Sequence, residues 1–281
     1  MDPSLNLPPL NVPALLRAHG LRAKMSLGQN FLMDPTALER IVEAAEIGPR
    51  DAVLEVGPGL GSLTRYLARA ARRVVAVELD SSLIPLLKEV LAGASNVDVI
   101  HADILELDPA QLMGEPGYLV VANIPYYITS NLIRHLLEAP LQPRRLVLTV
   151  QREVANRITA GPPDMSLLAL SVQVYGSPRI VARIPAGAFY PAPKVDSSAV
   201  RVDLYPHPLI APAHLNAFFQ LARAGFGQKR KTLRNALAAG LGWPSEKAAA
   251  LLSAAGIDPQ RRAETLSLAE WNALTERFTH L

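Results

Sequence analysis

The run Asn123-Ile124-Pro125-Tyr126 places a side-chain amide, a proline turn and an aromatic ring in four consecutive residues. It follows Tyr118–Ala122, an apolar segment that predicts a buried strand, so these residues lie where that strand ends. The amide oxygen of Asn123 and the main-chain carbonyl of Ile124 are two acceptors that can hold the hydrogens of an amino group. They favour the tetrahedral, positively charged state of an attacking nitrogen, and stabilising charge where it develops is a large catalytic effect.

These four residues match the Asn-x-Pro-aromatic motif of enzymes that methylate exocyclic amines of nucleobases. The N6 lone pair of adenine is delocalised into the ring, so the amine is a poor nucleophile that needs such acceptors. A target base must also be turned out of its stack, and the ring of Tyr126 offers a surface on which it can rest. Two other interpretations stay open: a turn chosen only for its geometry, and methylation of an amide such as glutamine.

A glycine turn, Gly57-Pro58-Gly59-Leu60-Gly61, follows the apolar segment Ala52–Val56. In parallel sheets, ligands bind at the carboxyl ends of the strands, where such a turn lets them approach the backbone closely. The turn is compatible with no ligand, with a nicotinamide dinucleotide or with S-adenosylmethionine. Its GxGxG spacing differs from the dinucleotide pattern GxGxxG, and Pro58 removes a donor that a phosphate needs. The turn therefore favours S-adenosylmethionine.

Two acidic residues follow the next two expected strands. Glu78 ends the strand Arg73–Glu78 and can accept hydrogen bonds from ribose hydroxyls, and Asp103 follows Val97–Ile100 and can accept from an adenine amino group. Either alone is compatible with a solvated loop carboxylate, and dinucleotide sites also use an acid placed like Glu78. Together with Gly57, these signals after three successive strands predict an S-adenosylmethionine site.

Strands and helices alternate along most of the chain, which predicts a parallel sheet covered on both faces, with an antiparallel far edge. The expected strands are Ala52–Val56, Arg73–Glu78, Val97–Ile100, Tyr118–Ala122, Leu146–Val150, Ser171–Tyr175 and Ala199–Leu204. One expected helix of this part begins after Asp34-Pro35. Three others cover Leu63–Ala70, Ser82–Leu91 and Ser130–Leu137.

The sequence divides into three expected parts. Residues 1–24 are a proline-rich lead-in, residues 25–204 form the methyltransferase domain, and residues 205–281 form a helical RNA-binding domain. The proline-rich segment Tyr205–Pro212 separates the last two. The expected helices of the third part are His214–Ala224, Arg230–Ala239, Glu246–Ala255 and Leu268–Phe278.

Positive charge gathers in the last quarter of the chain. Residues 204–281 hold 9 Lys and Arg against 5 Asp and Glu, although the net charge of all 281 residues is only +3. This excess favours a polyanionic partner and disfavours amide methylation. Four cations lie within Gln228–Asn235, around the start of the expected helix, where they can contact RNA phosphates or form an ordinary solvated face: Lys229, Arg230, Lys231 and Arg234. Arg230 and Arg234 are four positions apart, so we expect them to share a helical face.

The composition excludes several other classes. The chain has no cysteine, and its six histidines lack metal-ligand spacing, so we expect neither disulfides nor a metal site. No apolar stretch approaches the roughly 18 residues of a membrane span. The N-terminus lacks the pattern of a signal peptide. We therefore expect a cytoplasmic protein with no membrane partner.

Over nearly its whole length after about Lys24, the chain resembles the ribosomal RNA adenine N6,N6-dimethyltransferases, most closely their small-subunit branch. One departure is Tyr127, where the family often has Asn. The resemblance rests on GQNFL (Gly28–Leu32), LEVGPGLGSLT (Leu54–Thr64), VELD (Val77–Asp80), HADIL (His101–Leu105), NIPYYITS (Asn123–Ser130), QREVANRI (Gln151–Ile158), FYPAPKVDSSAV (Phe189–Val200), FGQKRKTLRNAL (Phe226–Leu237) and GIDPQRRAETLS (Gly256–Ser267).

The resemblance implies a seven-stranded Rossmann-like class I methyltransferase sheet with a small all-helical C-terminal domain. It implies dimethylation of two adjacent adenosines in the 3′-terminal hairpin loop of small-subunit rRNA, in a pre-30S particle, by a monomeric enzyme. By position, Asn30 and Leu32 join Gly57, Glu78, Asp103 and Asn123 at the cofactor, and Tyr126 and Phe189 flank the target base. The alternatives are a macrolide-resistance methyltransferase of large-subunit rRNA and a non-catalytic RNA-binding relative.

Overall fold

The computed structural model describes residues 7–125 and 128–280, which fold as two compact units. The first unit comprises the described residues up to Ala155 together with Arg179–Leu204, and the second comprises Asn156–Pro178 and the described residues from Tyr205 onward. The chain passes from the first unit to the second within the helix α7 (Arg152–Thr159) and returns within the strand β7 (Gly176–Ile184).

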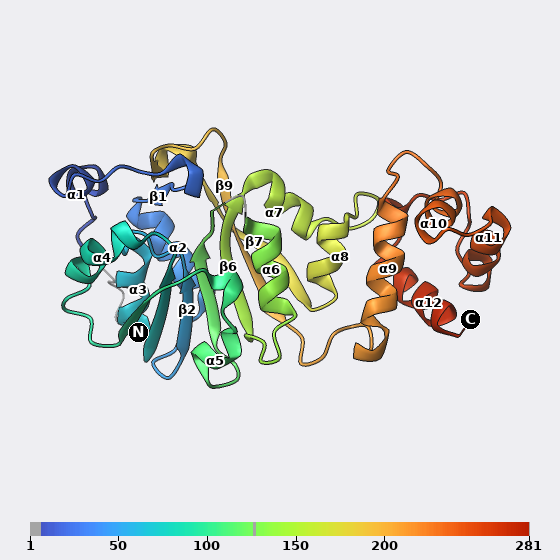
Figure 1. Ribbon diagram of the computed structural model, residues 1–281, viewed down its shortest axis with the longest axis horizontal. Coiled ribbons are helices and arrows are strands. Elements are labelled where there is room, and N and C mark those ends of the chain that lie inside the picture. Colours follow the sequence, from blue (N-terminus) through green and yellow to red (C-terminus); the bar gives the residue numbers. More distant parts are fainter. Residues whose placement is uncertain (1–6, 126–127, 281) are drawn as a thin grey trace. The chain divides into compact units, whose positions relative to one another are not determined.

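A seven-stranded sheet forms the centre of the first unit (Figure 1), in the order β4-β3-β2-β5-β6-β9-β7. The strands from β4 to β6 run parallel, and β9 pairs antiparallel with β6. The class I sheet with an antiparallel edge is therefore confirmed. Besides β7, the strands are β2 (Ala52–Val56), β3 (Arg73–Glu78), β4 (Val97–His101), β5 (Leu119–Asn123), β6 (Arg145–Gln151) and β9 (Ser197–Leu204).

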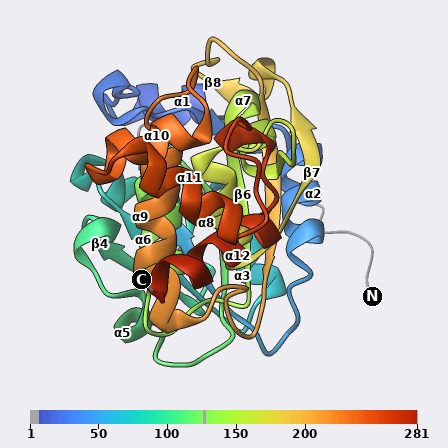
Figure 2. The ribbon, with the colours of Figure 1, turned by 90° about the vertical axis from the view of Figure 1, so that its right-hand side faces the viewer.

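Helices cover both faces of this sheet. Helix α2 begins where Asp34 caps the main-chain N–H of Ala37 and Pro35 occupies the first turn, as the sequence predicted. The apolar faces of α2 and α3 pack on one side of the sheet, and α6 lies on the other side of β6 from α2 (Figure 2). The helices of this unit include α1 (Val12–Ala18), α2 (Pro35–Ala45), α3 (Ser62–Ala70), α4 (Ile84–Val90), α5 (Pro109–Met113) and α6 (Thr129–Leu137).

A two-stranded ribbon lies outside the main sheet. Strand β1 (Phe31–Leu32) pairs antiparallel with β8 (Phe189–Tyr190), which brings together segments far apart in the sequence. Phe31 also belongs to a small apolar cluster with Val12 and Leu16 of α1. The ribbon and this cluster together hold the lead-in against the sheet domain.

The second unit is helical. Its helices include α8 (Leu167–Gln173), α9 (Leu215–Phe226), α10 (Leu233–Leu241), α11 (Ser245–Ala254) and α12 (Leu268–Thr279), and α9 and α10 cross closely (Figure 2). Gly240 permits that crossing, because a Cβ there would lie 2.5 Å from the Cβ of Ala224. The strand expected at Ser171–Tyr175 is wrong: most of it lies in α8, whose Ser166 caps the N–H of Ala169. The short alternating run was ambiguous, and this cap favours the helix.

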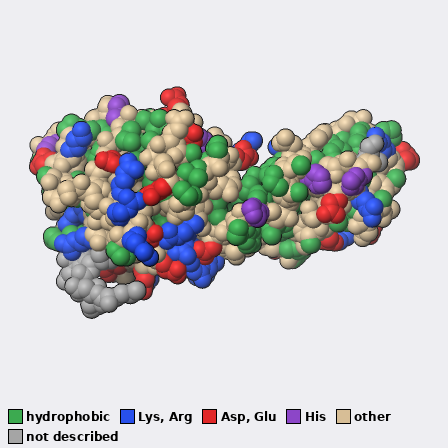
Figure 3. All heavy atoms as spheres, turned by 90° about the horizontal axis from the view of Figure 1, so that it is seen from below, with side chains coloured by type: hydrophobic (Ala, Val, Ile, Leu, Met, Phe, Trp, Pro, Cys, Tyr) green, Lys and Arg blue, Asp and Glu red, His purple; other side chains and the backbone are tan. Residues whose placement is uncertain are grey.

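The lower face of the first unit carries Lys and Arg side chains beside Asp and Glu (Figure 3). Arg144 donates to both carboxylate oxygens of Asp51 at 2.8 Å, and Arg145 pairs with Asp203 at 2.5 Å. The hydrogen bond from Arg144 lowers the pKa of Asp51 although partial burial opposes it. Arg144 and Arg145 are neutralised by these pairs, so the two side chains contribute little field for attracting a polyanion.

Candidate active site

A cavity of about 350 Å³ opens at the carboxyl ends of β2, β3, β4 and β5, within the range typical of small-molecule sites. Its lining includes the predicted cofactor residues Asn30, Leu32, Gly57, Glu78, Asp103 and Asn123. The parallel strands account for this arrangement, because their carboxyl ends meet at one edge of the sheet. Thus the structure brings together every residue that the sequence assigned to the cofactor.

The glycine turn needs its glycines. Gly57 and Gly59 have φ values of +70° and +58°, a backbone conformation that other residues rarely adopt. A Cβ on Gly59 would also lie 2.9 Å from the ring of Phe31. The turn therefore brings its main chain close to the cavity and to the loop that carries β1.

Glu78 is a buried carboxylate held by the main chain. Its Oε2 accepts a hydrogen bond from the N–H of Gly59 at 3.0 Å, and its Oε1 accepts one from the N–H of Asp80 at 2.8 Å. Burial raises the pKa of Glu78, although these main-chain bonds oppose the rise. Each carboxylate oxygen keeps a second lone pair, which can accept a hydroxyl hydrogen of a ligand.

Asn123 ends β5 and points its amide nitrogen at the segment just before β1. Its Nδ2 donates to the main-chain carbonyl of Asn30 at 3.0 Å, across 93 positions of sequence. Among the described residues no group donates to its Oδ1, which leaves that oxygen available at the cavity. The carbonyl of Ile124 follows immediately, so the two acceptors of the sequence prediction are adjacent.

The remaining predicted residues have different environments. Asp103 accepts from the N–H of Leu105 at 2.9 Å and lines the cavity. Phe189 is only 3% exposed, belongs to the core cluster and is absent from the cavity lining, whereas its neighbour Tyr190 is 37% exposed. Tyr126 and Tyr127 lie outside the described residues.

The four predicted RNA-contacting cations lie in the second unit, but not on one helix. Helix α10 begins at Leu233, so Arg234 is helical, whereas Lys229, Arg230 and Lys231 precede the helix in a turn. The expectation that Arg230 and Arg234 share a helical face is therefore wrong. Thr232 has an extended backbone and separates the turn from the helix. The cations of the turn are exposed.

Three polar residues of the site were missed by the sequence analysis. Asp80 and Gln29 hydrogen-bond to each other beside the cavity. Glu55 lines the cavity, is 1% exposed, and its Oε2 has no hydrogen-bond partner among the described residues. All three lie inside quoted motifs, and for Glu55 an acid between the apolar residues Leu54 and Val56 is the signal that could have identified it.

Burial raises the pKa of Glu55 to about 8, and the charge of Glu78 adds to the rise. The hydroxyl of Thr64 opposes it without making a hydrogen bond of ordinary geometry. Between pH 4.5 and about 8 the folded protein thus keeps a proton that the unfolded chain releases.

We therefore expect Glu55 to lower the free energy of unfolding as pH rises through that interval, by roughly 1 kcal/mol per pH unit. The stabilisation is complete below pH 4.5 and is lost above about pH 8. Urea unfolding of the wild-type protein and of Glu55→Gln, followed by circular dichroism between pH 5 and 8, measures this difference. A difference in stability that does not change with pH would show that Glu55 ionises normally in the folded protein.

No helix among the described residues is both long and apolar enough to cross a membrane. Within the same part of the chain, no group of three or more His, Asp or Glu side chains is arranged to hold a metal ion.

Comparison with known proteins connects this site to a family. The family model of ribosomal RNA adenine dimethylases matches residues 20–280. The chain is 49% identical to ribosomal RNA small subunit methyltransferase A of Dehalococcoides mccartyi strain CBDB1, over 92% of this chain and 90% of the relative. It is 44% identical to the protein of the same name from Pelotomaculum thermopropionicum, over 96% of both chains.

Solved structures agree with these sequence matches. The crystal structure of 23S rRNA methyltransferase ErmE is 32% identical, with a TM-score of 0.72 over 89% of this chain and all of that one. A dimethyladenosine transferase from Plasmodium falciparum is 27% identical, with a TM-score of 0.78 over 89% of this chain and 98% of the other. The protein therefore belongs to the ribosomal RNA adenine dimethylase family.

Proposed function

We propose that this protein transfers methyl groups from S-adenosylmethionine to N6 of two adjacent adenosines in the 3′-terminal hairpin loop of small-subunit rRNA, giving N6,N6-dimethyladenosine. The observation that carries the proposal is the amide of Asn123, which lines the cavity and donates through nitrogen to Asn30, while its oxygen accepts from none of the described residues. Relatives that match at 44–49% identity are named small-subunit methyltransferases, which supports that subunit over the large one.

The hydrogen-bond acceptors that line the cavity fit S-adenosylmethionine. Glu78 offers two acceptor oxygens for the ribose hydroxyls, and Asp103 offers an acceptor for the adenine amino group. The turn at Gly57 gives room for the amino-acid part, with Asn30 and Leu32 on the facing loop. When bound, S-adenosylmethionine supplies an electrophilic methyl group on a sulfonium.

The residues of this chain then act on the adenine. We infer that Asn123 Oδ1 and the carbonyl of Ile124 accept the two N6 hydrogens and orient the lone pair toward the methyl group. The developing positive charge on nitrogen strengthens both hydrogen bonds, and this difference between ground and transition state is what accelerates transfer. Tyr126 is proposed to stack on the base, and Phe189 to flank it.

The RNA is proposed to contact the second unit through Lys229, Arg230, Lys231 and Arg234. The exposed turn that holds the first three cations supports this assignment, since phosphate contacts position RNA without reading bases. The substrate is proposed to be a pre-30S particle, which places a monomeric enzyme in the cytoplasm and gives it a role in subunit biogenesis.

Changing Lys231 and Arg234 to Ala together should weaken RNA binding and flatten its salt dependence by about 0.7–0.9 log unit for each phosphate that is no longer neutralised. Binding isotherms at several salt concentrations, with a fragment of small-subunit rRNA, measure the slope. The matched control changes Arg223 and Arg277, two exposed cations of the same unit, and should keep the wild-type slope. An unchanged slope in the first variant would place the RNA elsewhere.

Mass spectrometry of unmethylated small-subunit rRNA, incubated with the protein and S-adenosylmethionine, tests the proposal directly. We expect two dimethylated adenosines in the 3′-terminal hairpin, and none when the cofactor is omitted. Methylation of large-subunit rRNA alone would instead identify the macrolide-resistance type, which the similarity to ErmE makes the second candidate. Binding without methylation of either RNA would identify a non-catalytic relative.

A further inference from the structure

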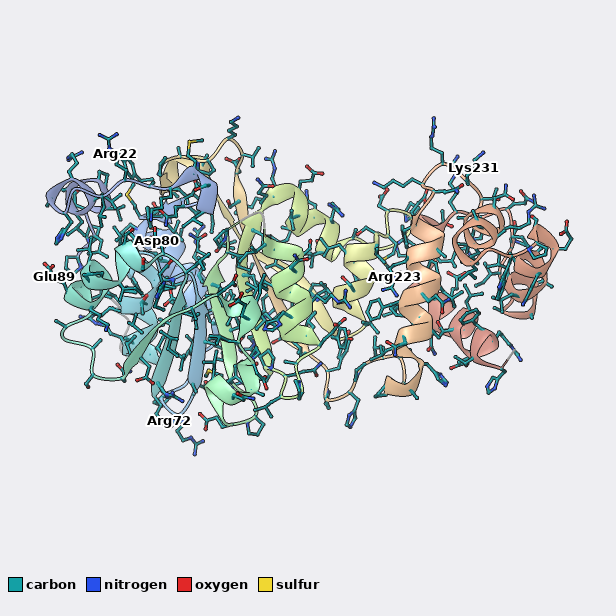
Figure 4. All side chains as sticks on the ribbon, in the orientation of Figure 1. Arg22, Arg72, Asp80, Glu89, Arg223 and Lys231 are labelled. Carbon is teal, nitrogen blue, oxygen red and sulfur yellow. The ribbon has the colours of Figure 1, made fainter. Side chains whose placement is uncertain are left out.

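Asp80 is a buried carboxylate that accepts hydrogen bonds from the distant 24–29 loop and from its neighbour Ser82. It is 3% exposed, and its Oδ1 accepts from Lys24 Nζ and from Ser82 Oγ, each at 2.6 Å. Its Oδ2 accepts from Gln29 Nε2 at 2.8 Å. Burial opposes ionisation, but these bonds lower the pKa of Asp80 to about 2, so the group is charged at neutral pH. Figure 4 shows Asp80 inside the unit, with Arg22 and Glu89 on its outside.

Two of these donors, Lys24 and Gln29, are the ends of one closed loop. Gln29 Oε1 accepts from the main-chain N–H of Lys24 at 2.8 Å, and the N–H of Gln29 donates to the carbonyl of Lys24 at 3.3 Å. Between them, Met25–Leu27 forms a 3-10 turn that ends at Gly28 with φ +62°. By binding Lys24 and Gln29, Asp80 therefore fixes both ends of the loop.

The residue after this loop contacts the proposed catalytic amide. The main-chain carbonyl of Asn30 accepts from Asn123 Nδ2 at 3.0 Å. Rotating that amide by 180° would place its oxygen against the Asn30 carbonyl, where two acceptors repel each other. The position of the Asn30 carbonyl thus selects the rotamer that leaves Asn123 Oδ1 for the substrate.

The main chain of Asp80 also reaches the proposed cofactor site. Its N–H donates to Glu78 Oε1 at 2.8 Å, while Glu78 Oε2 accepts from Gly59. One residue therefore holds the ribose-binding acid through its backbone and the loop before Asn30 through its side chain.

We infer that Asp80 is a positioning residue for methyl transfer, which fixes the 24–29 loop so that Asn30 holds the Asn123 amide with its oxygen toward the substrate amine. The inference rests on the proposed function of Asn123. A merely structural role is the rival, because Asp80 also caps the 3-10 turn after it by accepting from the N–H of Ser82 at 3.0 Å. That cap does not require Lys24 or the second carboxylate oxygen, so the two roles predict different results.

Asp80→Asn keeps the size of the side chain and its main-chain N–H to Glu78, but it places an NH2 group against Gln29 Nε2. We expect kcat to fall about 10- to 100-fold, because small misplacements of reacting groups have effects of this size. The dissociation constant for S-adenosylmethionine should stay near the wild-type value, because Glu78 keeps its partner. Steady-state methylation of the rRNA hairpin at saturating substrate and equilibrium cofactor binding measure the two quantities.

Lys24→Met tests the same path from the half-exposed end of the pair, where folding is less at risk. It should also lower kcat, but by a smaller factor than Asp80→Asn does. The effects of the two substitutions should be non-additive in the double variant, since both act through one contact. The matched control is Asp98→Asn, which breaks the exposed Arg73–Asp98 pair on neighbouring strands and should leave kcat unchanged.

A fall in kcat with cofactor affinity retained in Asp80→Asn and Lys24→Met would support the inference. A lower melting temperature with unchanged kcat would overturn it and leave Asp80 as a cap. If the wild-type protein methylates the hairpin and neither variant is slower, the inference is overturned but the proposed function stands. Absence of methylation by the wild-type protein would overturn the proposed function, and the inference with it.

Discussion

Asn123→Ala should reduce methyl transfer by about three orders of magnitude and leave the affinity for S-adenosylmethionine within a modest factor. Removal of a single group that stabilises transition-state charge typically has an effect of about 100- to 1,000-fold. Here the loss should lie at the upper end, because the same side chain also bonds to Asn30 and helps shape the cavity wall. The Ile124 carbonyl alone would leave the amine free to turn about its remaining hydrogen bond.

Single-turnover rates on the rRNA hairpin, with cofactor binding measured separately, give the two numbers. Asn96→Ala is the matched control, because its amide also donates to main-chain carbonyls, those of Ala68 and Ala71, but lies outside the cavity lining. It should lower stability without changing the rate. A rate for Asn123→Ala equal to that of the wild-type protein would remove the amide from the mechanism.

Asn123→Asp separates the two roles of the amide. The carboxylate keeps an acceptor for the substrate amine but has no hydrogen to donate to the carbonyl of Asn30. If the hydrogen bond to Asn30 is needed to orient the side chain, Asn123→Asp should recover only part of the activity that Asn123→Ala loses. Full recovery would show that an oxygen at this position is sufficient however it is held.

The sequence predicted the residues whose role depends on position along a strand. Gly57, Glu78, Asp103 and Asn123 follow successive strands of a parallel sheet, and parallel strands bring their carboxyl ends to one edge whatever the details of packing. Local pattern was therefore enough to place them at one cavity. The predicted helix start at Asp34-Pro35 succeeded for the same reason, since capping involves only neighbours in sequence.

The contacts that orient these residues could not be predicted in this way. The bond between Asn123 and Asn30 spans 93 positions, and Lys24 meets Asp80 across 56. Both involve the segment just before β1, and the two-residue strands of the β1–β8 ribbon are too short to show a period.

The helix expected over Arg230–Ala239 shows that its first residue could not be predicted from apolar spacing. Apolar spacing identified it, but the spacing carries no information on the turn at Lys229 that delays its start to Leu233. Helix ends are decided by such local contacts rather than by periodicity.

Glu78→Ala should raise the dissociation constant for S-adenosylmethionine at least about 100-fold, which corresponds to about 2.7 kcal/mol. Two hydrogen bonds from ribose hydroxyls to a charged acceptor contribute roughly 1.5–3 kcal/mol each, and the substitution removes both. The N–H groups of Gly59 and Asp80 also lose their acceptor, so the glycine turn should become less ordered. Isothermal titration with S-adenosylmethionine, beside thermal unfolding of the free protein, separates weaker ligand binding from a less ordered loop.

Glu78→Gln makes the test sharper, because Gln has one acceptor oxygen where Glu has two. One of the two main-chain N–H groups must then face an NH2, so affinity should fall between the values for wild type and Ala. The control is Glu89→Gln on α4, whose side chain is 66% exposed and should bind the cofactor normally. Burial also raises the pKa of Glu78, so the affinity of the wild-type protein should weaken on acidification before an exposed glutamate would protonate. That pH dependence should be absent from Glu78→Gln, and its persistence there would assign it to another group of the cavity such as Glu55. Wild-type affinity in both Glu78 variants would remove Glu78 from the ribose site.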